Sequence, residues 1–78
     1  MAENPKILQS QIGMRVVRRR QELGLTQEAL AARLGIKAPN VATIEYGQRN
    51  LTLQTRCKVA EALETTVQEL MFGTTAGK

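Results

Sequence analysis

The amino-acid sequence predicts an all-α fold of five short helices, and three observations support this prediction. Apolar residues recur every three or four positions along most of the chain, which is the period of an amphipathic helix. Four of the five segments begin after Asn, Ser or Thr, and four end at glycine, as capped helices do. No stretch alternates apolar and polar residues in the manner of a half-buried strand. The core must be aliphatic, because Tyr46 and Phe72 are the two aromatic residues of the chain.

The first helix has two candidate starting points. The Asn4-Pro5 dipeptide offers an N-cap followed by a proline at the first helical position. Ser10 is the alternative start, because Gly13 lowers the helix propensity of this segment. The helix is expected to end at Gly24. The residues near its inner face are Ile12, Val16, Val17, Arg20 and Leu23.

The second and third helices are short and almost adjacent. Thr26 is the predicted N-cap of the second helix, and Gly35 is its predicted stop. The third helix is expected over about residues 38–46, with Gly47 as its stop. Pro39 is tolerated because it lies in the first turn, where backbone N–H groups have no helical partner.

The fourth and fifth helices also follow from their caps. Thr52 is the predicted N-cap of the fourth helix, and Thr66 with Glu69 forms a Thr-x-x-Glu capping box that opens the fifth, which ends at Gly73. The apolar residues of the fourth helix are Leu53, Cys57, Val59, Ala60 and Leu63. Their helical spacing predicts that Cys57 is a small buried residue rather than a redox centre.

These elements define a single domain, which is all that 78 residues allow. We expect residues 10–73 to form it, residues 1–9 to be an arm or a helical extension, and residues 74–78 to be a disordered tail. No apolar run approaches the length of a membrane span, and the N-terminus lacks the apolar core of a signal peptide. The expected location is therefore the cytoplasm, with no membrane partner.

The composition argues against an enzyme. The chain has no histidine, which is the commonest general base and metal ligand. Its single cysteine excludes an intramolecular disulfide and a cysteine metal site. No nucleophile–base pair or phosphate-binding loop is present. We therefore expect no catalytic residues, no bound metal and no cofactor.

The turn at Gly35 suggests what the domain does. Two helices joined by a three- or four-residue turn that contains glycine describe a helix-turn-helix unit. In such a unit the third helix protrudes and leaves one face free to enter a DNA major groove. The net charge of +4 and the pI of about 9.9 also favour a polyanionic partner.

The stretch RRRQELGLTQEALAARLGIKAPNVATIEYGQRNLTL resembles the lambda-repressor-like domain, also called the Cro/repressor-type or Xre family. The resemblance covers about Ile12 to Phe72. It rests on GLTQEALA, on Gly35, on the residues from Ile44 to Gly47 and on the capped fourth helix. It implies a five-helix fold and a sequence-specific transcriptional regulator that binds double-stranded DNA, as a homodimer on a pseudo-palindromic operator.

The resemblance also assigns roles to individual positions. Family members contact base edges from positions that are Lys37, Ala38, Pro39, Asn40 and Thr43 in this chain. They contact phosphates from positions that are Gln27, Gln48, Arg49 and Asn50. A pair that bridges the first and third helices in many members falls on Arg20 and Glu45.

This chain departs from the family pattern in two ways. Ala38 and Pro39 cannot hydrogen-bond a base edge and can only contact thymine methyl groups, so direct readout would rest on Lys37, Asn40 and Thr43. Arg19 and Arg56 occupy positions that are more often apolar. We expect their stems to pack and their charged heads to reach solvent.

The pattern leaves several roles open. GQRNLTL looks like the controller proteins of restriction-modification systems, which bind their own promoter region, and this is the leading hypothesis. GIKAPNVATIE looks nearly as close to the antitoxins of toxin–antitoxin pairs, which would imply a toxin partner, and small phage-type repressors use the same domain. A protein-interaction adaptor that does not bind DNA is the alternative of another class.

The C-terminal helix is the predicted dimer interface. Small domains with marginal cores are commonly stabilised by oligomerisation. The end of the chain is also more apolar than a terminus requires, and an exposed apolar patch usually marks an interface. The residues expected in this interface are Val67, Leu70, Met71 and Phe72, and Ile7 and Leu8 are a second candidate.

Overall fold

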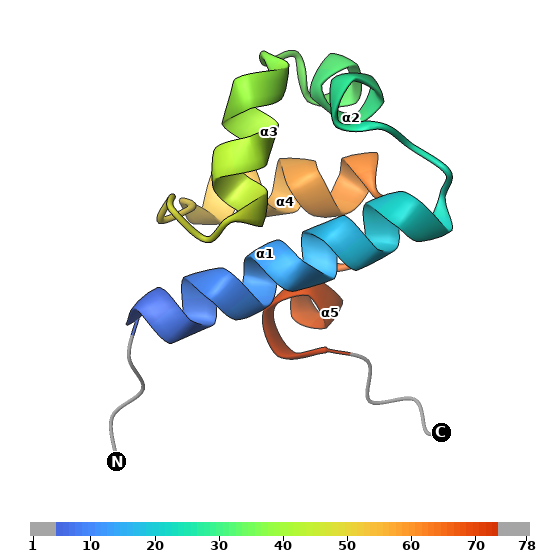
Figure 1. Ribbon diagram of the computed structural model, residues 1–78. Helices are drawn as coiled ribbons and strands as arrows, with labels where there is room; N and C mark the ends of the chain where they lie inside the picture. The colour runs from blue at the N-terminus through green and yellow to red at the C-terminus, as the bar shows by residue number, and fades with distance from the viewer. Residues whose placement is uncertain (1–4, 74–78) are drawn as a thin grey trace.

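The computed structural model describes residues 5–73 and confirms an all-α fold, with no strand among these residues (Figure 1). Its five helices are α1 (Pro5–Glu22), α2 (Gln27–Leu34), α3 (Ala38–Glu45), α4 (Leu53–Ala62) and α5 (Val67–Phe72). The earlier of the two predicted starts of the first helix is therefore the observed one, and residues 5–9 belong to α1. The predicted tail, residues 74–78, lies outside the described part of the chain.

In Figure 1, helix α1 crosses the view with α2, α3 and α4 above it and α5 below it. It packs against α3 on one side and against α5 on the other (Figure 1). Helix α2 contacts α3 and α4, and α4 also contacts α5, so that the helices enclose one core. The largest fully buried side chains come from four helices and are all aliphatic: Val16, Leu30, Val41, Val59 and Leu63. Both aromatic side chains lie on the surface.

The three predicted threonine N-caps are confirmed. The Thr26 hydroxyl accepts the Ala29 backbone N–H at 3.0 Å, and the threonines that precede α4 and α5 do the same at 3.1 Å. Each bond satisfies one of the N–H groups that a helix leaves unpaired in its first turn. At α5 the Thr65 hydroxyl also donates to the Glu69 carboxylate. This bond is the main reason why the pKa of Glu69 lies below its ordinary value. Glu69 is therefore an ionised acceptor at neutral pH.

Gly13 has a different role from the one that its helix propensity suggests. Helix α1 is continuous through this residue. A Cβ atom at Gly13 would lie 2.4 Å from the backbone oxygen of Glu45 and 2.7 Å from that of Ile44. Gly47 approaches the same helix, since a Cβ there would lie 2.7 Å from the Cα of Ser10. The two glycines therefore allow α1 to touch the C-terminal end of α3 directly.

The predicted burial of Cys57 is wrong. Its side chain is exposed, and Leu53, one turn earlier, is 67% exposed. The buried face of α4 is formed by Val59, Ala60 and Leu63. Successive helical residues are rotated by about 100°, so the positions of Leu53 and Cys57 fall at and beyond the edge of this face. The apolar residues of α4 span a wider arc than one neighbouring surface can cover.

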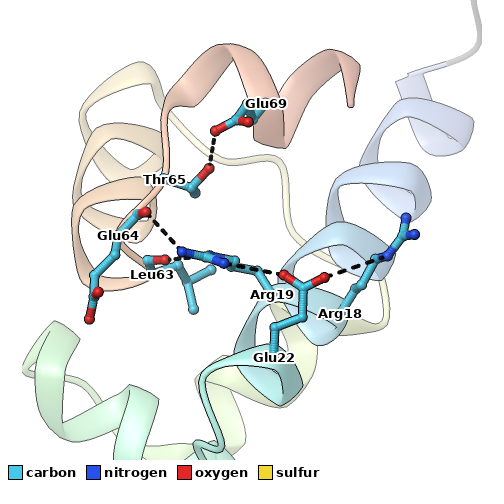
Figure 2. Close-up of polar contacts among 7 residues, drawn as sticks. All are labelled: Arg18, Arg19, Glu22, Leu63, Glu64, Thr65 and Glu69. Carbon is cyan, nitrogen blue, oxygen red and sulfur yellow. Dashed lines mark hydrogen bonds and ion pairs between the residues drawn. The ribbon is translucent and has the colours of Figure 1, made fainter. Parts of the chain in front are cut away.

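The head of Arg19, which was expected only to reach solvent, also forms bonds within the domain, and its side chain is 33% exposed. Its guanidinium donates to the backbone oxygens of Leu63 at 2.9 Å and Glu64 at 3.1 Å, at the end of α4 (Figure 2). It also donates to the Glu22 carboxylate at 3.2 Å. Carbonyl groups in the last turn of a helix have no helical partner and attract cations. Arg19 thus fastens α4 to α1.

Two further arginines fasten helix ends in the same way. Arg33 of α2 donates to the backbone oxygen of Ala62 at 2.8 Å, again at the end of α4. Arg15 of α1 donates to the backbone oxygens of Leu70 at 3.2 Å and Met71 at 2.7 Å, at the end of α5. Helix α5 has six residues, too few for a stable isolated helix. Its position therefore depends on Arg15 and on the core beneath it.

Candidate nucleic-acid interface

The turn between α2 and α3 is closed by two backbone hydrogen bonds. Gly35 adopts the left-handed conformation, with φ 70° and ψ 30°, and its N–H donates to the Ala32 oxygen at 3.3 Å. The Ile36 N–H donates to the Ala31 oxygen at 3.0 Å. This pair of bonds is the Schellman motif, which satisfies the last carbonyls of α2 and reverses the chain. Only three residues, 35–37, consequently separate α2 from α3.

Helix α3 buries one face and exposes the other. Val41, Ile44 and Glu45 are buried against the core, whereas Pro39 and Asn40 are exposed. Lys37 precedes the helix, is exposed and makes no side-chain cap. Four of the five predicted base-contacting residues therefore offer surface to a ligand. They are Lys37, Pro39 and Asn40 together with the partly exposed Thr43.

Ala38 and Thr43 limit the contacts that this face can make with base edges. Ala38 is partly buried and packs against the core, so it contributes little more than the backbone to the exposed surface. The Thr43 hydroxyl donates to the Asn40 backbone oxygen at 2.7 Å. Its proton is thereby engaged, and its lone pairs remain available. In this arrangement Thr43 can accept a hydrogen bond from a base amino group, such as adenine N6 or cytosine N4.

A buried polar cluster joins three helices behind this face. Arg20 Nε lies 2.6 Å from Glu45 Oε2, and the two side chains are 13% and 3% exposed. Another nitrogen of Arg20 donates to the Leu25 backbone oxygen at 2.8 Å, in the connection from α1 to α2. Gln27 Nε2 donates to Glu45 Oε1 at 2.9 Å. The Glu45 carboxylate thus fixes the first residue of α2 and the last residue of α3 to α1.

Gln27 retains bonding capacity after this contact. A side-chain amide carries two N–H donors and one carbonyl acceptor, and Glu45 uses one of the donors. The second N–H is free to meet a phosphate. The sequence pointed to a surface role for Gln27 and gave no sign of its bond to Glu45.

The loop after α3 presents three exposed polar side chains, Gln48, Arg49 and Asn50. Two of them, Arg49 and Asn50, line a cavity of about 150 Å³ that also involves Arg56 of α4. The head of Arg56 was expected to reach solvent. Its Nε atom is buried without a hydrogen-bond partner, whereas the residue as a whole is partly exposed.

The four residues predicted for the dimer interface differ in their accessibility. Leu70 is 3% exposed and belongs to the core of its own domain. Val67 and Met71 are partly buried against that core. Phe72 is 69% exposed. A partner could therefore contact Phe72 fully and the other two only in part.

Two other kinds of site are absent from residues 5–73. No group of three or more His, Cys, Asp or Glu side chains is placed to hold a metal ion. No helix in this range combines the length and the apolar character that crossing a bilayer requires.

Comparison with known proteins identifies the family. Residues 16–70 match the helix-turn-helix family designated HTH_3. The chain belongs to this family. This HTH_3 member is 38% identical over 63 residues to the uncharacterized HTH-type transcriptional regulator y4dJ of Sinorhizobium fredii, and the aligned residues make up 81% of this chain and 82% of that protein.

Two solved structures place the HTH_3 member among known folds. The restriction-modification controller protein C.AhdI from Aeromonas hydrophila superposes with a TM-score of 0.80 and 34% identity, over 87% of this chain and 99% of that one. The P22 c2 repressor protein, solved with a synthetic operator, gives a TM-score of 0.74 over 81% of this chain and 96% of its own, at 22% identity, which shows a shared fold. The predicted lambda-repressor-like fold is confirmed, and the chain is a DNA-binding helix-turn-helix regulator of transcription.

Proposed function

We propose that this protein is a restriction-modification controller that binds its own promoter region as a homodimer. The observation that carries the DNA-binding part is the free face of α3, where Lys37 and Asn40 are exposed and form no ion pair or side-chain hydrogen bond with the described residues. The polar cluster behind this face keeps α3 rigid relative to α2. The controller role is supported by the likeness to C.AhdI, nearly all of whose chain superposes.

A selection of bound sequences from a random DNA pool tests the proposal. A dimer places two recognition helices about 34 Å apart, so the selected sites should be inverted repeats with half-sites one helical turn apart. A match to the region upstream of the protein's own gene, next to genes for a methyltransferase and an endonuclease, would support the controller role. A neighbouring toxin gene would favour the antitoxin alternative. Absence of salt-dependent DNA binding would favour the adaptor.

We predict that two groups of residues on this surface act differently. Asn40 and Thr43 should contact base edges, whereas Gln27 and Arg49 should contact phosphates. Asn40→Ala should therefore cost about 1–3 kcal/mol of binding free energy on the selected site and little on a scrambled duplex. Arg49→Ala should weaken binding to both duplexes alike, because a phosphate contact carries no sequence information.

The measurement is the affinity of each variant for both duplexes at several salt concentrations. Each phosphate contact contributes about 0.9 to the slope of log K against log salt concentration, so Arg49→Ala should flatten this slope by about one unit per protomer. Lys58→Ala is the control, since Lys58 is exposed on α4 and lies outside the proposed surface. Equal losses on both duplexes for Asn40→Ala and Thr43→Ala would mean that α3 does not read the sequence.

We also predict that Phe72 contributes to the dimer interface. Phe72→Glu places a charge on the most exposed of the four C-terminal apolar residues, and burying that charge between protomers is unfavourable. Sedimentation should then show a weaker dimer with an intact fold, because Leu70 still fills the core. The matched control is Met14→Glu on α1, where an apolar side chain is also 69% exposed. An unchanged dimer in Phe72→Glu would exclude the α5 interface.

A further inference from the structure

Arg56 lies on α4 behind the loop that follows α3. Its Nε atom is buried, and no described residue offers it a hydrogen-bond acceptor. Burying an unpaired donor destabilises a fold, and the penalty is larger when the group is charged. The buried arginine nitrogens of the Arg20 cluster, by contrast, have acceptors in Glu45 and Leu25. The Nε–H group of Arg56 therefore contributes no hydrogen bond to the fold.

The cavity that Arg56 lines has room for a small chemical group. Its volume is about 150 Å³, and its polar lining consists of Gln9, Arg49, Asn50 and Arg56. The other lining residues are aliphatic side chains of α1, α3, α5 and the loop. A water molecule occupies about 30 Å³ of liquid, so this space accommodates a group of roughly five heavy atoms. A phosphate group has that number.

The charges around this cavity are unbalanced. Neither Arg49 nor Arg56 forms an ion pair with a residue in the described range, and no acidic residue lines the cavity. The larger cavity between α1 and α5 is different, because its three arginines are matched by three glutamates. Two neighbouring guanidinium groups repel one another, and an oxyanion that both can bind removes this repulsion.

We propose that Arg49 and Arg56 hold one phosphate group at the mouth of this cavity, and that the phosphate belongs to the DNA backbone. This inference rests on the proposed DNA-binding function and adds a residue of α4 to it. The exposed Arg49 and Asn50 reach the phosphate from the loop, and Arg56 reaches it from behind. Arg56 is thus a backbone-positioning residue of this chain, at a position where its family more often has an apolar side chain.

The variant Arg56→Met tests this inference, because it keeps the apolar stem and removes the charged head. Two changes of opposite sign are expected. The melting temperature should rise, since a buried unpaired donor is lost. DNA affinity should fall equally on selected and scrambled duplexes, and the salt slope should flatten by less than the roughly one unit of a whole phosphate contact, because Arg49 still contacts the shared phosphate. Arg56→Lys should recover most of the slope. Lys58→Met, an exposed site on the same helix, should change neither quantity.

The possible outcomes separate this inference from the proposed function. If wild type binds DNA and Arg49→Ala flattens the slope, but Arg56→Met does not, the inference fails and the function stands. A lower melting temperature for Arg56→Met would show a structural role and would also overturn it. If wild type binds no duplex in a salt-dependent manner, both fail together.

A final measurement identifies the source of the anion. The NMR signal of the Arg56 Nε–H group should shift when the selected duplex is added to the wild-type protein. Inorganic phosphate alone should shift it only at much higher concentration, because a free anion lacks the remaining DNA contacts. A shift with inorganic phosphate and none with the duplex would make this a free-anion site and would overturn the assignment to DNA.

Discussion

Gly13→Ala is expected to lower the free energy of unfolding by about 3 kcal/mol, at the upper end of the usual cost of overpacking. An alanine normally stabilises a helix interior by about 1 kcal/mol relative to glycine. Here the added Cβ would lie 2.4 Å from the Glu45 oxygen, which belongs to the backbone and cannot move away by a change of rotamer. Helix α1 or the end of α3 would have to shift.

Denaturant unfolding of Gly13→Ala measures this loss, and Gly24→Ala is the matched control. A Cβ at Gly24 meets nothing within 4 Å, although φ is +71°, so only a backbone penalty of about 1–2 kcal/mol is expected there. A stabilised Gly13→Ala protein would show that α1 and α3 do not approach as closely as described. Because the shift would act on the end of α3, DNA affinity should fall together with stability.

Arg20→Ala is expected to cost about 3–5 kcal/mol of unfolding free energy, because it leaves the Glu45 carboxylate buried without its cation. That carboxylate is 3% exposed, and Gln27 alone remains to donate to it. Arg18→Ala is the control. Arg18 is 81% exposed and lies 4.0 Å from Glu22, and a surface pair of this kind contributes about 0–1 kcal/mol.

A double variant separates folding from DNA binding in this cluster. Replacing both partners, as Arg20→Met with Glu45→Leu, removes the stranded charge and should recover much of the stability. It also leaves Gln27 without the acceptor that orients it. Its DNA affinity should therefore remain below that of wild type. Thermal unfolding and DNA binding measured on the same preparations distinguish the two effects, and full recovery of both would exclude a positioning role for Glu45.

The sequence predicts those elements of the fold that depend on local chemistry. Threonine caps and glycine stops act within one turn of the chain, so α2 and the start of α4 lie where Thr26, Gly35 and Thr52 indicate. Features that depend on distant partners are not predictable in this way. The role of Gly13 is decided by the end of α3, and that of Arg19 by the end of α4.

The candidate site likewise contains features that the local sequence predicts and features that depend on distant packing. Its exposed residues, such as Asn40 and Arg49, follow from the helix-turn-helix pattern and its resemblance to a family. The bond from Gln27 to Glu45 and the burial of the Arg56 Nε atom follow from packing that no local pattern encodes. Cys57 shows the limit of periodicity, because a helix with apolar residues over a wide arc does not reveal which part of the arc is covered.

Net charge is an equally indirect guide to the DNA surface. The chain has seven arginines, and four of them donate to backbone or side-chain acceptors inside the domain: Arg15, Arg19, Arg20 and Arg33. These four still contribute to the positive field that attracts a polyanion. Part of their donor capacity is already used inside the domain. The basic pI therefore arises partly from arginines that form bonds inside the domain and not only from residues that could contact DNA.

The arginines that fasten α4 and α5 bind main-chain oxygens, so donor and acceptor positions differ in which substitutions they tolerate. Every amino acid supplies the same carbonyl, so the acceptor positions place no demand on their own side chains through these bonds. The donor positions have no such freedom, because a fork of several N–H groups on a long stem is peculiar to arginine. These bonds alone thus leave Ala62 and Glu64 free to vary, and the limits on them have other sources: Ala62 packs against the core, and the Glu64 carboxylate pairs with Arg33 at 3.2 Å. The surface of α4 can diversify toward new partners without loosening its attachment.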